Sequence, residues 1–183
     1  MNREIALAIL NEYTETDSLR KHAYAVEAAM RAYAKKFGED EELWGAIGLI
    51  HDFDYEKYPD NHPQKGNEIL AEKGLPEDLR KVIMGHADFT GVPRDTLMAK
   101  VLFAVDELSG FIVAVTLVRP NQSIGEVAVK SVKKKMKDKR FAAKVNREEI
   151  KKGAEELGVD FDEHVTFMVQ ALSNVATDLG LNP

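Results

Sequence analysis

The sequence predicts an all-helical protein, because apolar residues recur at helical spacing along most of its 183 residues. Strict alternation of apolar and polar residues, which is typical of half-buried strands, is scarce. Residues that favour helix ends also stand where the apolar pattern starts and stops. Neither an internal repeat nor a low-complexity linker interrupts the pattern, so we expect a single domain over residues 1–183.

The first half of the chain is expected to contain five helices. They cover roughly residues 2–12, 17–36, 39–51, 61–74 and 76–86. Thr16 or Asp17 is the expected N-cap of the second helix, and Gly38 is expected to end it. Pro63 suits the first helical position of the fourth helix, where its missing N–H costs nothing.

The second half is expected to contain four more helices. They cover roughly residues 94–117, 123–140, 146–157 and 160–178. Ser123 and Glu126 have the spacing of a capping box, which would open the second of these. The basic run at 130–140 is expected to be the solvated end of that helix, with lining of a substrate cleft by part of it as the alternative. We therefore expect a core over about 15–115 and a C-terminal helical extension over 121–183.

Composition narrows the function. The chain has no cysteine, which excludes thiol nucleophiles, disulfides and zinc-finger sites and leaves oxygen and nitrogen ligands. Its net charge of −6 gives no basic field, so a nucleic-acid partner is not expected. The longest apolar stretch, near 101–118, is interrupted by Asp106 and Glu107, so no membrane span is expected. A charged N-terminus in place of a signal peptide favours a cytoplasmic protein.

Several polar residues fall on the apolar faces of the expected helices. They are His22, His51, His62, His86 and Asp106. A buried carboxylate needs a compensating partner, and a metal ion ligated by neutral imidazoles provides one. Each residue alone has a simpler explanation, since one histidine can be a hydrogen-bonded core residue and Asp106 can pair with a basic side chain. The shared placement of all of them favours a metal site.

The order of these residues, with Asp52 directly after His51, resembles the HD-domain superfamily of metal-dependent phosphohydrolases. Three segments carry the resemblance, namely Leu49-Ile50-His51-Asp52-Phe53-Asp54-Tyr55-Glu56, His62-Pro63-Gln64-Lys65-Gly66 and Met84-Gly85-His86-Ala87. The likeness covers roughly residues 15–115 and implies an HD-type helical bundle.

The resemblance also implies a ligand set and a reaction. His22, His51, Asp52 and Asp106 would hold a first metal ion, and His62 and His86 would hold a second, with Asp52 bridging. One or two divalent ions are implied: Mn, Fe, Co, Ni or Zn, with Mg also compatible. The reaction would be hydrolysis of a phosphate ester or anhydride, of a nucleotide or another small phosphorylated metabolite, by metal-activated water.

Further residues are candidates for the same site. Asp52 is the expected catalytic carboxylate, and Lys65, which lies three residues after His62, is expected to contact the substrate phosphate and assist catalysis. Arg20 is a second candidate for substrate binding. Asp54 and Asp88 could orient water or ligands, although a surface or capping role is the favoured explanation for each.

Two other functions remain open at this stage. A di-iron oxygenase can use the same helical scaffold with a similar ligand set, because a fold does not determine its reaction. A non-catalytic module that binds a metal or a nucleotide is the other alternative. Departures from better-known subgroups, such as Phe53-Asp54 directly after the His-Asp pair, leave the substrate unnamed.

Overall fold

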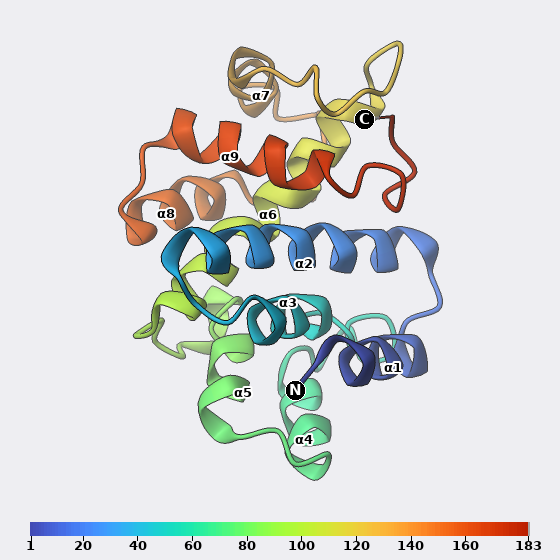
Figure 1. The fold of residues 1–183 in the computed structure, drawn as a ribbon, viewed down its shortest axis with the longest axis vertical. Coiled ribbons are helices and arrows are strands. Elements are labelled where there is room, and N and C mark those ends of the chain that lie inside the picture. Colours follow the sequence, from blue (N-terminus) through green and yellow to red (C-terminus); the bar gives the residue numbers. More distant parts are fainter. Residues whose placement is uncertain (183) are drawn as a thin grey trace.

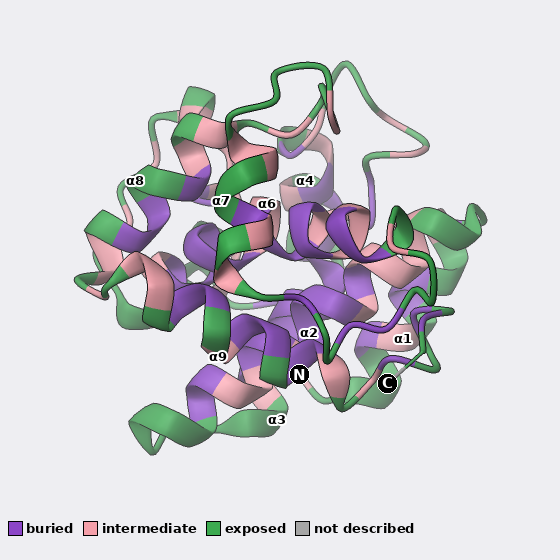
Figure 2. Ribbon diagram, turned by 90° about the horizontal axis from the view of Figure 1, so that it is seen from above, coloured by how far each residue is buried: buried purple, intermediate pink, exposed green. Residues whose placement is uncertain are grey.

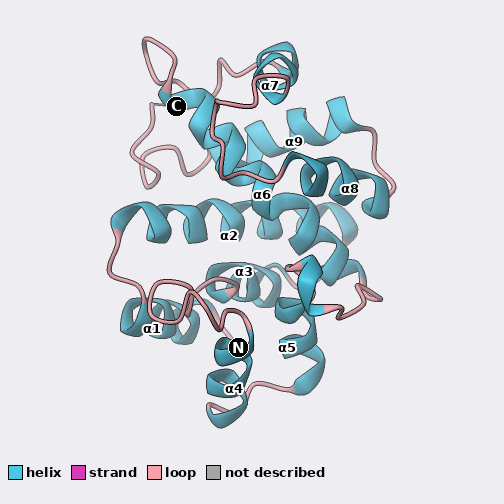
Figure 3. Cartoon of the chain, turned by 180° about the vertical axis from the view of Figure 1, so that it is seen from behind, coloured by secondary structure: helices cyan, strands magenta, loops and turns pink. Residues whose placement is uncertain are grey.

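A computed structural model describes residues 1–182, which form nine α-helices, one 3-10 turn and no strand (Figure 3). The first five helices are α1 (Arg3–Tyr13), α2 (Asp17–Phe37), α3 (Glu41–Ile50), α4 (Gln64–Glu72) and α5 (Glu77–Met84). The 3-10 turn η1 (Asp88–Thr90) leads to α6 (Leu97–Leu117), α7 (Val129–Met136), α8 (Arg147–Leu157) and α9 (Phe161–Ser173). The all-helical fold class predicted from the sequence is confirmed.

The two longest helices, α2 and α6, organise the bundle (Figure 1). On one side of α2 lie α3 and α1, with α4 and α5 beyond them. On its other side lie α6, α8, α9 and α7. The C-terminal helices α8 and α9 both pack against α6, so the extension shares a core with the first half of the chain.

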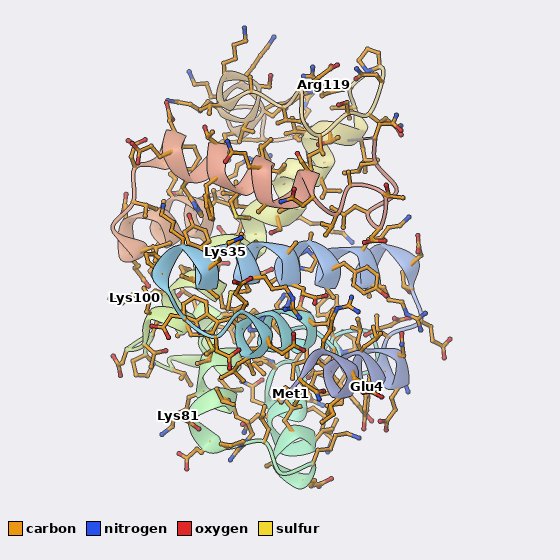
Figure 4. The ribbon with its side chains drawn as sticks, viewed as in Figure 1. Met1, Glu4, Lys35, Lys81, Lys100 and Arg119 are labelled. Carbon is orange, nitrogen blue, oxygen red and sulfur yellow. The ribbon has the colours of Figure 1, made fainter. Side chains whose placement is uncertain are left out.

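Helix ends follow the residues that favour them. Gly38 adopts a left-handed backbone with φ 73° and ends α2 at the position predicted. The Asp40 carboxylate accepts the N–H groups of Glu42 and Leu43 and so begins α3. Along the helices the apolar faces point inward, and the buried residues form one continuous core (Figure 2). Charged side chains project outward, as Lys81 on α5 does (Figure 4).

The predicted capping box at Ser123 is wrong. Ser123 lies in a short strand-like pairing with Asn182, and the N–H of Ile124 donates to the Asn182 carbonyl at 2.9 Å. Ile124 is fully buried, so tertiary packing holds this segment extended against its local preference. The helix instead begins at Val129.

Some helix boundaries differ slightly from the predicted ones, and two of these lie next to candidate ligands. The helix expected to reach His51 ends at Ile50, and the fourth helix begins after Pro63 instead of on it. The last helix ends at Ser173, short of the predicted 178. No helix within residues 1–182 combines the length and the apolarity that crossing a membrane requires.

Candidate metal centre

The six predicted ligands come from five parts of the fold. His22 lies on α2, His51 and Asp52 directly follow α3, His62 precedes α4, His86 follows α5, and Asp106 lies on α6. The structure brings them into two groups whose ligand atoms lie within 4.8 Å of one another, His22, His51, Asp52 and Asp106 in the first group and Asp52, His62 and His86 in the second. Asp52 belongs to both groups.

Hydrogen bonds fix the turn that follows α3 against the start of α2. The Glu56 carboxylate accepts the N–H groups of Glu15 and Thr16, and the Thr14 hydroxyl donates to the Phe53 carbonyl at 3.0 Å. These contacts join the turn that carries His51 and Asp52 to the segment just before α2, the helix that carries His22. Three members of the first group therefore meet at the α2–α3 interface, and α6 adds Asp106.

In the first group the imidazoles of His22 and His51 face two carboxylates. The distance from Nε2 to Oδ1 of Asp106 is 2.9 Å for His22 and 3.3 Å for His51. The Oδ2 atom of Asp52 lies 3.5 Å from His51 Nε2 and 3.9 Å from His22 Nε2. His51 is fully buried, whereas the other three side chains retain some exposure.

In the second group two imidazoles share the other oxygen of Asp52. Oδ1 lies 3.2 Å from His62 Nε2 and 3.1 Å from His86 Nε2. Asp54, which is buried, holds His62 from behind: its Oδ1 accepts from His62 Nδ1 at 2.7 Å, and its Oδ2 accepts the Gly66 N–H at 2.7 Å. A Cβ on Gly66 would stand 2.7 Å from the Asp54 carboxyl carbon, so glycine is required there.

The tautomers make these groups suitable for a cation. His51 Nδ1–H donates to the Gly48 carbonyl, and His86 Nδ1–H donates to the Ile83 carbonyl, so each neutral ring has its lone pair on Nε2. His51 Nε2 is buried without a hydrogen-bond partner. The Nε2 atoms of His62 and His86 face each other at 3.2 Å. Lone pairs opposed in this way repel unless a proton or a metal ion lies between them.

Without a metal ion, the pKa values of these groups also favour positive charge on the imidazoles. Burial opposes the charged form of His51, but the carboxylates of Asp52 and Asp106 outweigh it and raise the pKa of His51 to about 9. Burial also opposes charge on His62, and its hydrogen bonds to Asp52 and Asp54 raise its pKa to about 9. Burial would raise the pKa of Asp52, yet His51 and the other imidazoles hold it well below its ordinary value.

Both groups open into a pocket of about 580 Å³. All of the six residues except His51 line it, and His51 lies behind them. Exposed aromatic side chains, Tyr55 and Phe89, stand in the lining. The rest of the wall comes from α2, from the start of η1, from α6 and from the residues around the start of α8.

Lys65 and Arg20, which were predicted to bind the substrate, do not line this pocket within residues 1–182. The ammonium group of Lys65 pairs with Glu68 at 2.8 Å, because α4 begins at Gln64 and directs Lys65 along its own helix. Arg20 Nε donates to the Thr14 carbonyl at 2.8 Å. Asp88 does line the pocket, where it pairs with Arg94 and Lys152.

Sequence reasoning missed several lining residues. Glu107, Lys144, Asn146 and Glu149 come from regions without a motif. The neighbouring basic run at 130–140 contributes no residue to the lining. Burial and the adjacent Asp106 raise the pKa of Glu107 to about 7. The one feature of the sequence that could have identified a lining residue was the position of Glu107 directly after Asp106.

Comparison with known proteins gives one match. The family model of the HD domain matches residues 19–110, about half of the chain, and this stretch contains all six residues of the two groups. No curated protein and no solved structure matches the chain.

Proposed function

The chain belongs to the HD domain family, and from this premise we propose that it is a metal-dependent phosphohydrolase. Its reaction would be the hydrolysis of a phosphate ester or anhydride of a nucleotide or another small phosphorylated metabolite. Most members of the superfamily are metal-dependent phosphohydrolases. The proposal also depends on the residues of this chain, which are considered in turn below.

The observation that carries the proposal is the convergence of the two groups on Asp52. Two carboxylates and four imidazoles meet there, and at least two of the imidazoles have Nε2 lone pairs directed inward. Such mixed nitrogen and oxygen sites suit divalent transition metals. When bound, such ions would polarise a phosphoryl group and lower the pKa of water toward neutrality.

Hydrogen bonds to the backbone and to one carboxylate hold three of the imidazoles in place. Backbone carbonyls orient His51 and His86, and the Asp54 carboxylate orients His62. Supports of this kind fix the tautomer and the ring orientation of a ligating histidine. These three rings are therefore already oriented, and they bind a cation once they are in the neutral form.

The lining also indicates which nucleophile is used. Among the described residues it contains no serine, threonine or cysteine, so it presents no aliphatic hydroxyl and no thiol. The proposal takes a metal-activated water as the nucleophile. Asp52 would act at the reacting centre, because its two oxygens face the two groups separately.

The size of the pocket favours a small substrate. Its volume of about 580 Å³ lies within the range of about 300–1,000 Å³ usual for small-molecule sites. Tyr55 and Phe89 offer apolar surface for the organic part of such a molecule.

Elemental analysis of anaerobically purified protein, joined to a phosphatase and phosphodiesterase substrate screen with Mn, Co, Ni and Mg, tests the proposal. We expect bound divalent metal and phosphate release. Asp52→Ala should lose both while its circular dichroism stays helical, and Asp60→Asn, an exposed carboxylate nearby, is the matched control.

Three outcomes would contradict it. If Asp52→Ala kept the metal content of the wild type, the assignment of the metal site would be wrong. Oxygen consumption with Fe(II), without phosphate release, would favour an oxygenase. A ligand that stays intact for hours on the metal-loaded protein would favour a binding module.

A further inference from the structure

Part of the pocket wall comes from the C-terminal extension. Lys144, Val145, Asn146 and Glu149 line the pocket, although they lie outside the stretch that matches the HD domain. Lys144 is the only lysine or arginine in the lining among the described residues. The other side chains of the lining are carboxylates, imidazoles, the Tyr55 phenol, the Asn146 amide and apolar groups, so the extension supplies the one ammonium group.

Lys144 differs from the other cations around the site in having no partner within residues 1–182. Lys152 and Arg94 pair with Asp88, and Lys65 pairs with Glu68. Lys144 forms no ion pair and no hydrogen bond of its side chain with the described chain, although carboxylates line the same pocket. Its ammonium group is therefore free for a ligand.

The backbone around Lys144 is held firmly. The guanidinium of Arg147 donates to four carbonyls of the segment 138–145, those of Asp138, Phe141, Ala142 and Val145. The same guanidinium lies over the Phe111 ring of α6, 5.3 Å from its centroid. A cation on a fixed backbone loses less conformational freedom on binding than one on a mobile loop.

A hydrogen bond joins this segment to α6, the helix that carries Asp106. The N–H of Asn146 donates to Oε2 of Glu107 at 3.1 Å, and Glu107 is the neighbour of Asp106 on α6. The Asn146 side chain then caps α8 by accepting the N–H groups of Glu148 and Glu149. Lys144 is thus two residues from a bond to the helix that carries a predicted ligand.

We propose that Lys144 binds a phosphate oxygen of the substrate in the pocket that Asp52 also lines, so that the extension completes the substrate site. This rests on the proposed function. An ammonium group donates charge-assisted hydrogen bonds to phosphate oxygens, which suit it as a compact point charge. It takes the role that spacing along the helix had predicted for Lys65.

The test compares Lys144→Ala, Lys144→Arg and the control Lys139→Ala in the Mn-loaded full-length protein. Lys139 is an exposed lysine of the same segment, outside the pocket. One readout is the dissociation constant of inorganic phosphate by isothermal titration calorimetry. The other is the separate measurement of KM and kcat for p-nitrophenyl phosphate. Circular dichroism and metal content verify that each variant folds and is loaded.

We expect Lys144→Ala to bind phosphate about tenfold more weakly and to raise KM by a similar factor, with bound metal unchanged. Lys144→Arg should recover most of the loss, and Lys139→Ala should match the wild type. Equal phosphate affinity in Lys144→Ala and wild type overturns the inference while leaving the proposed function standing. A wild type that neither binds phosphate nor hydrolyses any ester overturns both.

Discussion

Replacing Asp54 with asparagine should weaken one metal site and spare the other. The Asp54 carboxylate accepts hydrogen bonds from His62 Nδ1 and from the Gly66 N–H, both at 2.7 Å. An asparagine of the same shape keeps only one acceptor oxygen. If that oxygen accepts from Gly66, the amide NH₂ faces His62 Nδ1 and favours the tautomer with the proton on Nε2, which blocks ligation.

The size of the effect follows from burial. Asp54 is 1% exposed, so solvent does not screen or replace the lost bond. A hydrogen bond to a buried charged group contributes about 1.5–3 kcal/mol, which corresponds to roughly a 10- to 150-fold loss of affinity. Losses of about 10- to 100-fold are usual when the partner of a metal-ligating histidine is removed. We expect a loss of this size at the group of Asp52, His62 and His86 alone.

The assay is a calorimetric titration of metal-free protein with Mn(II), followed by elemental analysis after gel filtration. Wild type should bind two ions, and Asp54→Asn should retain the ion at His22, His51 and Asp106. Adding His22→Ala to the variant should then remove the remaining ion. Asp60→Asn, an exposed carboxylate in the loop between α3 and α4, is the matched control.

Two results would refute this reasoning. If Asp54→Asn bound both ions with wild-type affinity, the carboxylate would not position His62. If both sites weakened equally while circular dichroism remained helical, the two groups would not be separable.

Three other variants or conditions extend the argument. His51→Ala removes the buried imidazole of the first group, so elemental analysis should show less bound metal at nearly unchanged helicity, and wild-type metal content would count against its role. Gly153→Ala would place a Cβ 2.6 Å from the Ala104 Cα and force α8 away from α6, so urea denaturation should show a loss of about 1–3 kcal/mol, against little change in the exposed-site control Lys151→Ala. In metal-free protein, burial opposes the charge on His51, yet Asp52 and Asp106 raise its pKa from 6.5 to about 9. Protonated His51 therefore stabilises the folded protein fully at pH values below its unfolded pKa, and this stabilisation is lost as the pH rises through about 9. The thermal unfolding temperature should decrease when the pH is raised from about 7 to about 10, and it should decrease less in His51→Ala. A midpoint that rose over that interval would show that the sign is wrong.

The helix positions and the convergence of the candidate ligands were the most predictable features, the first from local spacing and the second from the family resemblance and the polar residues on apolar faces. The apolar period located α2 and α6, and Gly38 marked the end of α2. The polar residues that interrupt apolar faces, such as Asp106, were conspicuous because burying them demands a compensating charge. The role of Asp54 was less evident, since a carboxylate that supports His62 looks the same in a sequence as a surface acid.

Local spacing failed where a contact distant in the chain decided the outcome. Ser123 and Glu126 have the pattern of a helix start, but pairing with Asn182 and the burial of Ile124 hold the segment extended. Lys65 has helical spacing from His62, yet the helix begins between them and the ammonium group turns to Glu68.

By itself, then, the sequence determined an all-helical chain and the side chains able to hold a metal ion, since periodicity and residue chemistry are properties of short segments. The family resemblance had implied that Asp52 bridges the two groups, but only the tertiary structure decided how its two oxygens lie between them and that the residues around Lys144 form part of the pocket wall. The physical reason is that both depend on how α8 packs on α6 and how α3 packs on α2, and such packing depends on complementary surfaces far apart in the chain.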